Sequence, residues 1–286
     1  MILLSRIVRF LLVCNMFVGS IDADGRGKMS RRIRNLVASV VVICICEFCA
    51  AQSITVAAAA DLQFAIQDVA AQFQKHTGKE VKLIYGSSGN FFQQLQNGAP
   101  FDMFFSANLD YAKKLESAGL TEPGSYYEYA KGKIVVWVEK DSTLDVSSGL
   151  QVLLSPSIKK IAVANPQHAP YGQAAIAAMQ KEGIYDKVKD KFVLGENISQ
   201  TASFVMSGSA DVGIVALSLA LSPSMKDKGR YFEVPASDYP PIQQACVILG
   251  SSKNKDTAKQ FLSFVKTSGA AEIMKKYGFD VQSDQQ

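Results

Sequence analysis

Four short turns of mostly small residues carry the chemical signal in this chain. They are Ala58-Ala59-Ala60-Asp61, Ser87-Ser88-Gly89-Asn90, Ala169-Pro170-Tyr171-Gly172 and Asn197-Ile198-Ser199-Gln200. Each follows a predicted strand and starts a predicted helix, where unpaired backbone N–H groups and the positive end of the helix dipole are presented. One such turn is an ordinary connection, but four of them beside an export signal suggest helix starts that converge on a small anion. The pattern favours capture of an oxyanion outside the cytoplasm over catalysis.

The individual residues of these turns leave alternatives open. Ser87 and Ser88 offer hydroxyl donors, or serve only as helix caps. Gly89 lets backbone approach closely. Tyr171 turns its hydroxyl or N–H toward a cleft, or only packs, and Ile198 can offer nothing but its backbone N–H.

Enzyme motifs are sparse. The chain has two histidines, His76 and His168. No His, Cys and carboxylate cluster has metal-ligand spacing, and no nucleophile elbow, Walker loop or dinucleotide fingerprint occurs. We therefore expect no enzyme and no cofactor. The alternative from a different class is an exported hydrolase that uses Asp61 with His168.

The elements that must position these turns alternate between strand and helix, which predicts an α/β fold. Apolar runs predict strands at 54–60, 81–85, 101–106, 133–139, 160–164, 192–194, 211–216, 231–234 and 245–250. Helical spacing predicts helices at 62–77, 91–96, 109–117, 150–154, 173–181, 201–207, 256–267 and 269–277. Asp61 is expected to cap the first of these helices. The elements form two α/β blocks, which are either sequential or interleaved.

The N-terminal 51 residues look like a leader that contains a signal peptide. Arg31, Arg32 and Arg34 precede the apolar run 36–45, and small residues precede Gln52. Met29 is the more conventional start for such a signal, and a membrane anchor is the alternative. The leader holds seven Lys and Arg against three acids, so 23 of each sign remain from the chain's 30 and 26. A neutral body argues against nucleic-acid binding.

Four of the five cysteines lie in the leader, so the mature chain keeps only Cys246 and has no disulfide. Its apolar neighbours predict a buried thiol.

Beyond these patterns, eight stretches follow a familiar order along the chain: 54–62, 86–90, 97–102, 105–107, 161–166, 169–172, 213–215 and 276–279. In these stretches the chain resembles the substrate-binding proteins of molybdate ABC transporters. The resemblance implies a two-lobed periplasmic-binding-protein fold, each lobe a mixed, mostly parallel sheet flanked by helices, with the ligand between the lobes. It favours the interleaved arrangement, with residues 52–131 and 236–286 as lobe I and 132–235 as lobe II.

The resemblance also implies that Asp61, Ser88, Tyr171 and Ile198 hold the oxyanion, so that the metal is bound through its oxygens. Tyr171 matches one branch of the family; another branch has a tyrosine after Gly-Ile-Val, where this chain has Ala216. Asp61 departs from the serine or asparagine of many relatives. Its carboxylate is expected to cap the helix and leave its own N–H for the ligand. Alternatively it accepts a proton from a protonated oxyanion, which would favour phosphate.

The implied function is capture of molybdate, and of tungstate, for the membrane permease of an ABC transporter. A monomeric periplasmic protein, exported by a cleaved signal peptide, is expected. A sulfate or phosphate receptor is the alternative within the same class.

Overall fold

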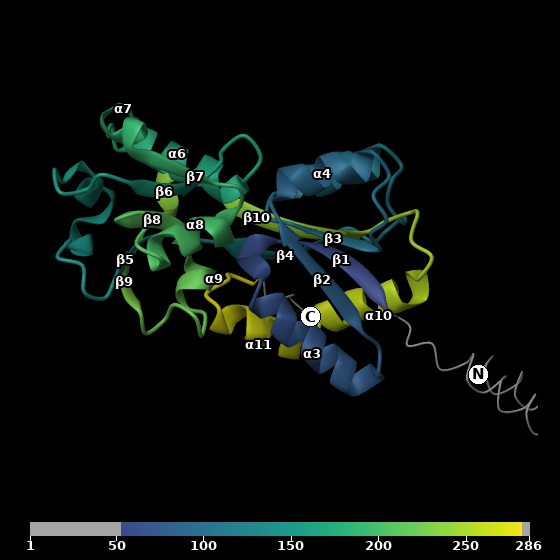
Figure 1. Cartoon of the computed structure of the whole chain (residues 1–286). Helices are drawn as coiled ribbons and strands as arrows, with labels where there is room; N and C mark the ends of the chain where they lie inside the picture. The colour runs from purple at the N-terminus through teal and green to yellow at the C-terminus, as the bar shows by residue number, and fades with distance from the viewer. Residues whose placement is uncertain (1–52, 282–286) are drawn as a thin grey trace, which may run out of the picture. The chain divides into compact units, whose positions relative to one another are not determined.

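The computed structural model describes residues 53–281, and the predicted leader and signal peptide lie outside this range. The described chain forms two five-stranded sheets (Figure 1). The first has the order β2-β1-β3-β10-β4, with β1 Ile54–Ala59, β2 Val81–Gly86, β3 Met103–Ser106, β4 Tyr127–Gly132 and β10 Ile242–Ile248. The second has the order β7-β6-β8-β5-β9, with β5 Ile134–Glu139, β6 Ile161–Ala164, β7 Phe192–Gly195, β8 Val212–Ala216 and β9 Gly229–Glu233. The predicted α/β fold with two mixed sheets is confirmed.

Both sheets pair their strands in the same way. In the first, β1 lies parallel to β2 and β3, while β10 is antiparallel to β3 and β4. In the second, β6 lies parallel to β7 and β8, while β5 is antiparallel to β8 and β9. The carboxyl ends of the parallel strands therefore open into the turns that start the helices.

Helices and short 3-10 turns connect the strands. They are η1 Ala60–Leu62, α3 Ala65–Thr77, α4 Ser88–Gln96, α5 Leu109–Ser117, η2 Val146–Leu154, α6 Pro170–Lys181, α7 Tyr185–Val188, η3 Lys189–Lys191, α8 Ile198–Met206, α9 Leu217–Ala220, η4 Ala236–Asp238, α10 Lys255–Val265 and α11 Ser268–Lys276. Every helix predicted from the sequence has a counterpart. The strand β4 has no predicted counterpart.

Alternating residues of the first sheet face two separate cores, as the two-residue period of a strand requires. Val56 and Phe105 pack with the helices α3, α10 and α11, whereas Ala57 and Phe104 pack with α4 and α5. Figure 1 shows α4 on one side of this sheet and α3, α10 and α11 on the other. Cys246 is fully buried in the first of these cores, as predicted, and burial raises the pKa of its thiol.

The chain passes between the sheets twice. It leaves the first sheet after Gly132 and enters the second at Ile134, then leaves the second after Glu233 and returns at Ile242. The limits predicted for the two lobes stay a prediction.

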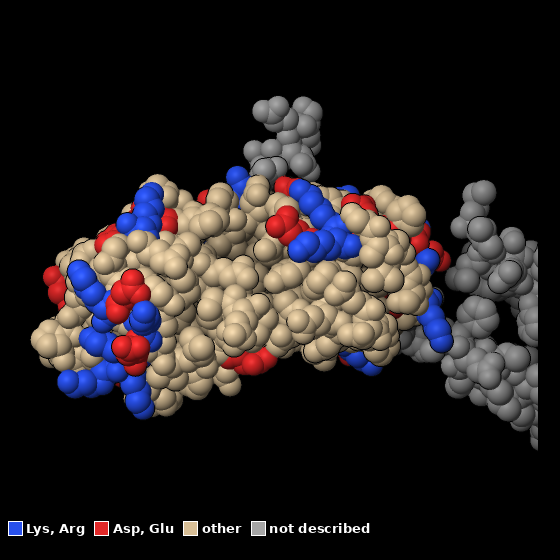
Figure 2. Space-filling view, turned by 90° about the horizontal axis from the view of Figure 1, so that it is seen from above, with Lys and Arg blue, Asp and Glu red and all other residues tan. Residues whose placement is uncertain are grey.

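Among residues 53–281, no helix has the length and apolar character that a membrane crossing needs. On the face shown in Figure 2, Lys and Arg side chains lie interspersed with Asp and Glu.

Candidate functional site

A small cavity lies where the four turns meet. It has a volume of about 10 Å³ and is lined by Ala59, Ala60, Asp61, Gly86, Ser87, Ser88, Ala107, Ala169, Pro170, Tyr171, Asn197 and Ile198. The turns after β1 and β2 supply one wall, and the turns before α6 and α8 supply the other. The four predicted turns, which lie between residues 58 and 200 of the sequence, therefore surround one space.

Ser88 presents a hydroxyl to this cavity and is not a helix cap. Its Oγ accepts a hydrogen bond of 2.9 Å from the N–H of Ala107, and the residue is 1% exposed. Accepting that bond leaves the hydroxyl proton available to donate. The cap of α4 is Ser87, whose Oγ accepts from the N–H of Asn90 and lies 2.8 Å from His168 Nδ1.

Ile198 lines the cavity and is the first residue of α8. Asn197 caps that helix, and its Oδ1 accepts from the N–H groups of Ser199 and Gln200 at 3.0 Å each. The cap does not use the N–H of Ile198, which as a first-turn N–H has no partner within the helix.

Asp61 is buried, at 1% exposure, in the 3-10 turn η1. Its Oδ2 accepts hydrogen bonds from the Tyr171 hydroxyl at 2.9 Å and from Gln244 Nε2 at 2.7 Å. Its Oδ1 is buried and has no partner among the described residues. Burial raises the pKa of Asp61 to about 6, against the opposing effect of hydrogen bonds from Gln244, from Tyr171 and from its own backbone N–H.

The prediction that Asp61 caps the following helix is therefore wrong. The helix α3 begins only at Ala65. The residue at its N-cap position is Phe64, which makes no side-chain hydrogen bond to the first turn. Asp61 lies within η1, which ends at Leu62 before this helix begins, and the two side-chain donors on Oδ2 hold the carboxylate in the interior.

Tyr171 lies at the start of α6, and its hydroxyl is shared between two partners. It donates to Asp61 and accepts from Gln244 Nε2 at 3.1 Å. Gly132 makes room for it, because a Cβ there would lie 2.0 Å from the Tyr171 hydroxyl oxygen. Burial raises the pKa of Tyr171 well above 10. A direct contact between Tyr171 and a ligand stays a prediction.

Gln244 is a site residue that the sequence reasoning missed. It is fully buried on β10, where its Oε1 also accepts a bond of 2.7 Å from the hydroxyl of Tyr129 on β4. The available signal was a glutamine pair inside an otherwise apolar run, Ile-Gln-Gln-Ala-Cys-Val-Ile.

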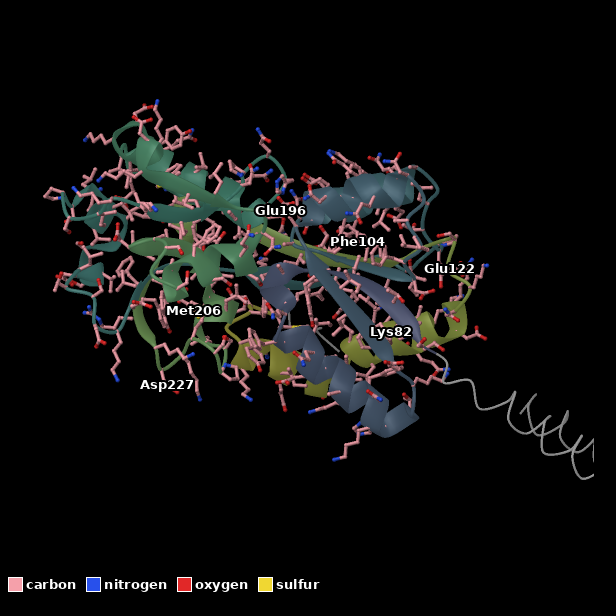
Figure 3. All side chains as sticks on the ribbon, viewed as in Figure 1. Lys82, Phe104, Glu122, Glu196, Met206 and Asp227 are labelled. Carbon is pink, nitrogen blue, oxygen red and sulfur yellow. The ribbon has the colours of Figure 1, made fainter. Side chains whose placement is uncertain are left out.

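Several hydrogen bonds join residues next to one wall with residues next to the other. The N–H of Gly89 donates to the His168 carbonyl at 2.9 Å, and Asn90 Nδ2 donates to Glu196. Figure 3 shows Glu196 beside the start of α4.

On the opposite side, Ser199 Oγ bonds the Ala60 carbonyl at 2.9 Å and Ser218 Oγ bonds the Asp61 carbonyl at 2.7 Å. Four hydrogen bonds thus connect the turns of one wall with the segments of the other.

The hydrolase alternative finds no support in this arrangement. His168 bonds Ser87 and lies 4.0 Å from Glu196, whereas Asp61 bonds Tyr171 and Gln244. Within 53–281, no group of three or more His, Cys, Asp and Glu is arranged to hold a metal ion.

Comparisons with known proteins agree with this geometry. The family described as "Bacterial extracellular solute-binding protein" matches residues 54–280. The chain is 39% identical over 236 residues to the molybdate-binding protein ModA of Azotobacter vinelandii, covering 82% of this chain and 93% of that one. It is 38% identical over 230 residues to ModA of Rhodobacter capsulatus, covering 80% and 89%.

Among solved structures, the periplasmic molybdate-binding protein of Azotobacter vinelandii superimposes with a TM-score of 0.76 at 36% identity, covering 80% of this chain and all of that one. The matched family consists of binding proteins rather than enzymes. The chain belongs to the family of bacterial extracellular solute-binding proteins.

Proposed function

We propose that this protein captures molybdate, and also tungstate, outside the cytoplasm and delivers it to the membrane permease of an ABC transporter. The observation that carries the proposal is the cavity between the four helix starts, in a chain 38–39% identical to two molybdate-binding proteins. Asp61, Ser88, Tyr171 and Ile198 are the proposed contacts.

The donors available to an anion in this cavity are dipoles. They include the hydroxyl of Ser88 and the first-turn N–H of Ile198, and no Lys or Arg is among the lining residues. Preorganised N–H and O–H groups at helix starts stabilise an oxyanion without a counter-cation. Selection against sulfate would then depend on the size of the closed cavity, because both dianions are tetrahedral.

We propose that the lobes comprise residues 52–131 with 236–286, and 132–235, and that they close on the anion by a hinge motion. The two passages of the chain between the sheets, near Gly132 and between Glu233 and Ile242, are the candidate hinges. The protein would act as a periplasmic monomer after cleavage of its signal peptide.

A phosphate receptor is the second candidate, since the partnerless Oδ1 of Asp61 could accept a proton from a protonated oxyanion. A calorimetric titration of the purified protein with molybdate, tungstate, sulfate and phosphate separates the two. Molybdate and tungstate should bind at micromolar concentration and raise the melting temperature, as linkage requires. Equal stabilisation by sulfate, or a preference for phosphate, would refute the assignment to molybdate.

A further inference from the structure

One oxygen of the candidate site has no bonding partner. Asp61 Oδ1 is the one buried side-chain oxygen or nitrogen without a hydrogen bond among residues 53–281, and Asp61 lines the cavity. A buried polar atom left without a partner is costly and needs an explanation. Here the missing partner has a place to sit, since the cavity is where the proposed anion binds.

The groups around Asp61 give its carboxyl no positive charge. Tyr171 from α6 and Gln244 from β10 both donate to Oδ2, and Ser218 from α9 donates to the backbone carbonyl. Tyr129 from β4 is the other titratable side chain that interacts with this carboxyl. Burial holds the pKa values of both tyrosines well above 10, so both stay neutral in the physiological range.

A dianion beside an ionised Asp61 would therefore meet uncompensated repulsion in a site of low dielectric constant. Protonation removes that repulsion. Since Oδ2 already accepts two hydrogen bonds, the proton belongs on Oδ1. A protonated Oδ1 changes from a partnerless acceptor into a donor.

We propose that Asp61 holds the anion as a neutral carboxyl that donates a hydrogen bond from Oδ1, so that capture of a dianion takes up one proton from solvent. The proton leaves again when the anion is released. This inference rests on the proposed function, because it requires an oxyanion in the cavity.

The proposal makes anion affinity depend on pH, with a defined sign. Burial raises the pKa of Asp61 to about 6 in the protein without ligand, and a bound dianion raises it further. Below about pH 6 the carboxyl already carries its proton, so binding takes up none. Above that value each binding event takes up close to one proton, and the dissociation constant should rise about tenfold per pH unit.

The test is calorimetry with micromolar molybdate at pH 5 and pH 8, in buffers of different ionisation enthalpy. The wild type should take up about one proton at pH 8 and almost none at pH 5. Asp61→Asn carries a permanent amide donor, so it should show no uptake and a pH-independent dissociation constant. His76→Asn removes an exposed imidazole on α3 and should keep the uptake of the wild type.

An infrared difference spectrum supplies a readout that does not depend on a folded variant. Molybdate binding to the wild type at pH 8 should generate a protonated-carboxyl band that shifts in heavy water. Its absence would overturn the proposal.

Zero uptake by the wild type at pH 8, or uptake that persists in Asp61→Asn, would also overturn it. Failure of the proposed function has a different signature, namely no heat with molybdate or tungstate. Sulfate and phosphate would then be titrated in the same buffers. Phosphate binding without proton uptake, or no heat with all four anions, refutes both proposals.

Discussion

The contact between Gly89 and His168 should affect the affinity for the anion, although neither residue lines the cavity. Gly89 is the second residue of α4, and its N–H donates to the His168 carbonyl. A Cβ on Gly89 would lie 2.7 Å from that carbonyl oxygen and 2.8 Å from its Cα, distances that real Cβ atoms do not show. Because both obstructing atoms are backbone, Gly89→Ala should force the two walls apart.

The magnitude follows from two costs to the closed form. Overpacking of this kind costs about 1–3 kcal/mol, and the hydrogen bond lost from Gly89 is worth about 0.5–1.5 kcal/mol. Together, a cost of about 1.5–4.5 kcal/mol corresponds to a dissociation constant raised roughly 10- to 2,000-fold. In the open form the alanine should stabilise α4 by about 0.5–1 kcal/mol relative to glycine.

The assay is calorimetry with molybdate together with thermal unfolding without ligand. Gly269→Ala is the matched control, because Gly269 is also the second residue of a helix and also follows a serine. A Cβ added at Gly269 would have no atom within 4 Å. The control should gain helix stability and keep its affinity. A Gly89→Ala dissociation constant within twofold of the wild type would refute closure through this contact. If Gly89→Ala lowers the free energy of unfolding without ligand by as much as it lowers the free energy of binding, the contact between Gly89 and His168 is already present without the anion.

Three further substitutions probe the cavity wall. Ser88→Ala removes a hydroxyl donor to the anion and leaves the N–H of Ala107 without its acceptor. Calorimetry should show affinity lowered about 10- to 150-fold, and urea unfolding should show a free energy of unfolding lower by about 1–3 kcal/mol. Unchanged affinity would mean that Ser88 has only a structural role. Tyr171→Phe deletes a donor to Asp61, and urea unfolding at pH 8 should show a loss of about 1.5–3 kcal/mol; a variant as stable as the wild type contradicts that bond. The folded pKa of Asp61, about 6, lies above its ordinary 3.8, so the stability of the wild type should fall as pH rises between these values. Between pH 4 and pH 7 the free energy of unfolding of the wild type, relative to that of Asp61→Asn, should fall by about 2.4 kcal/mol. A difference that stays constant between the two pH values would count against the raised pKa.

Local sequence patterns predicted the helices and strands well where the segment itself carries a clear apolar pattern and its own end signals. The helix at Leu109–Ser117 has the predicted limits, because Asn108 caps it and Gly119 ends it. The strand Tyr127–Gly132 was missed, since its sequence Tyr-Glu-Tyr-Ala-Lys-Gly has no apolar run. Its partner in the sheet, β10, lies more than 100 residues later, and local periodicity does not report such a pairing.

In the candidate site, too, local signals predicted some features and missed those that depend on distant residues. The positions of Ser88 and Ile198 could be predicted, because strand ends and helix caps are local signals. The orientation of Asp61 could not, because an aspartate before a helix resembles a cap until its competing donors are known. One of those donors, Gln244, is 183 residues away in the sequence.

The charge of the cavity wall decides how an anion could be held there. Among the lining residues, Asp61 has the one carboxyl group, and the charge of its ionised form has the wrong sign for an anion. An ion pair is therefore not the source of affinity at this wall, and an ionised Asp61 would oppose binding. The site can hold a dianion only if the carboxyl is neutral or absent from contact. The partnerless Oδ1 beside the cavity favours the neutral form, because protonation satisfies the buried oxygen and supplies a donor to the anion in one step.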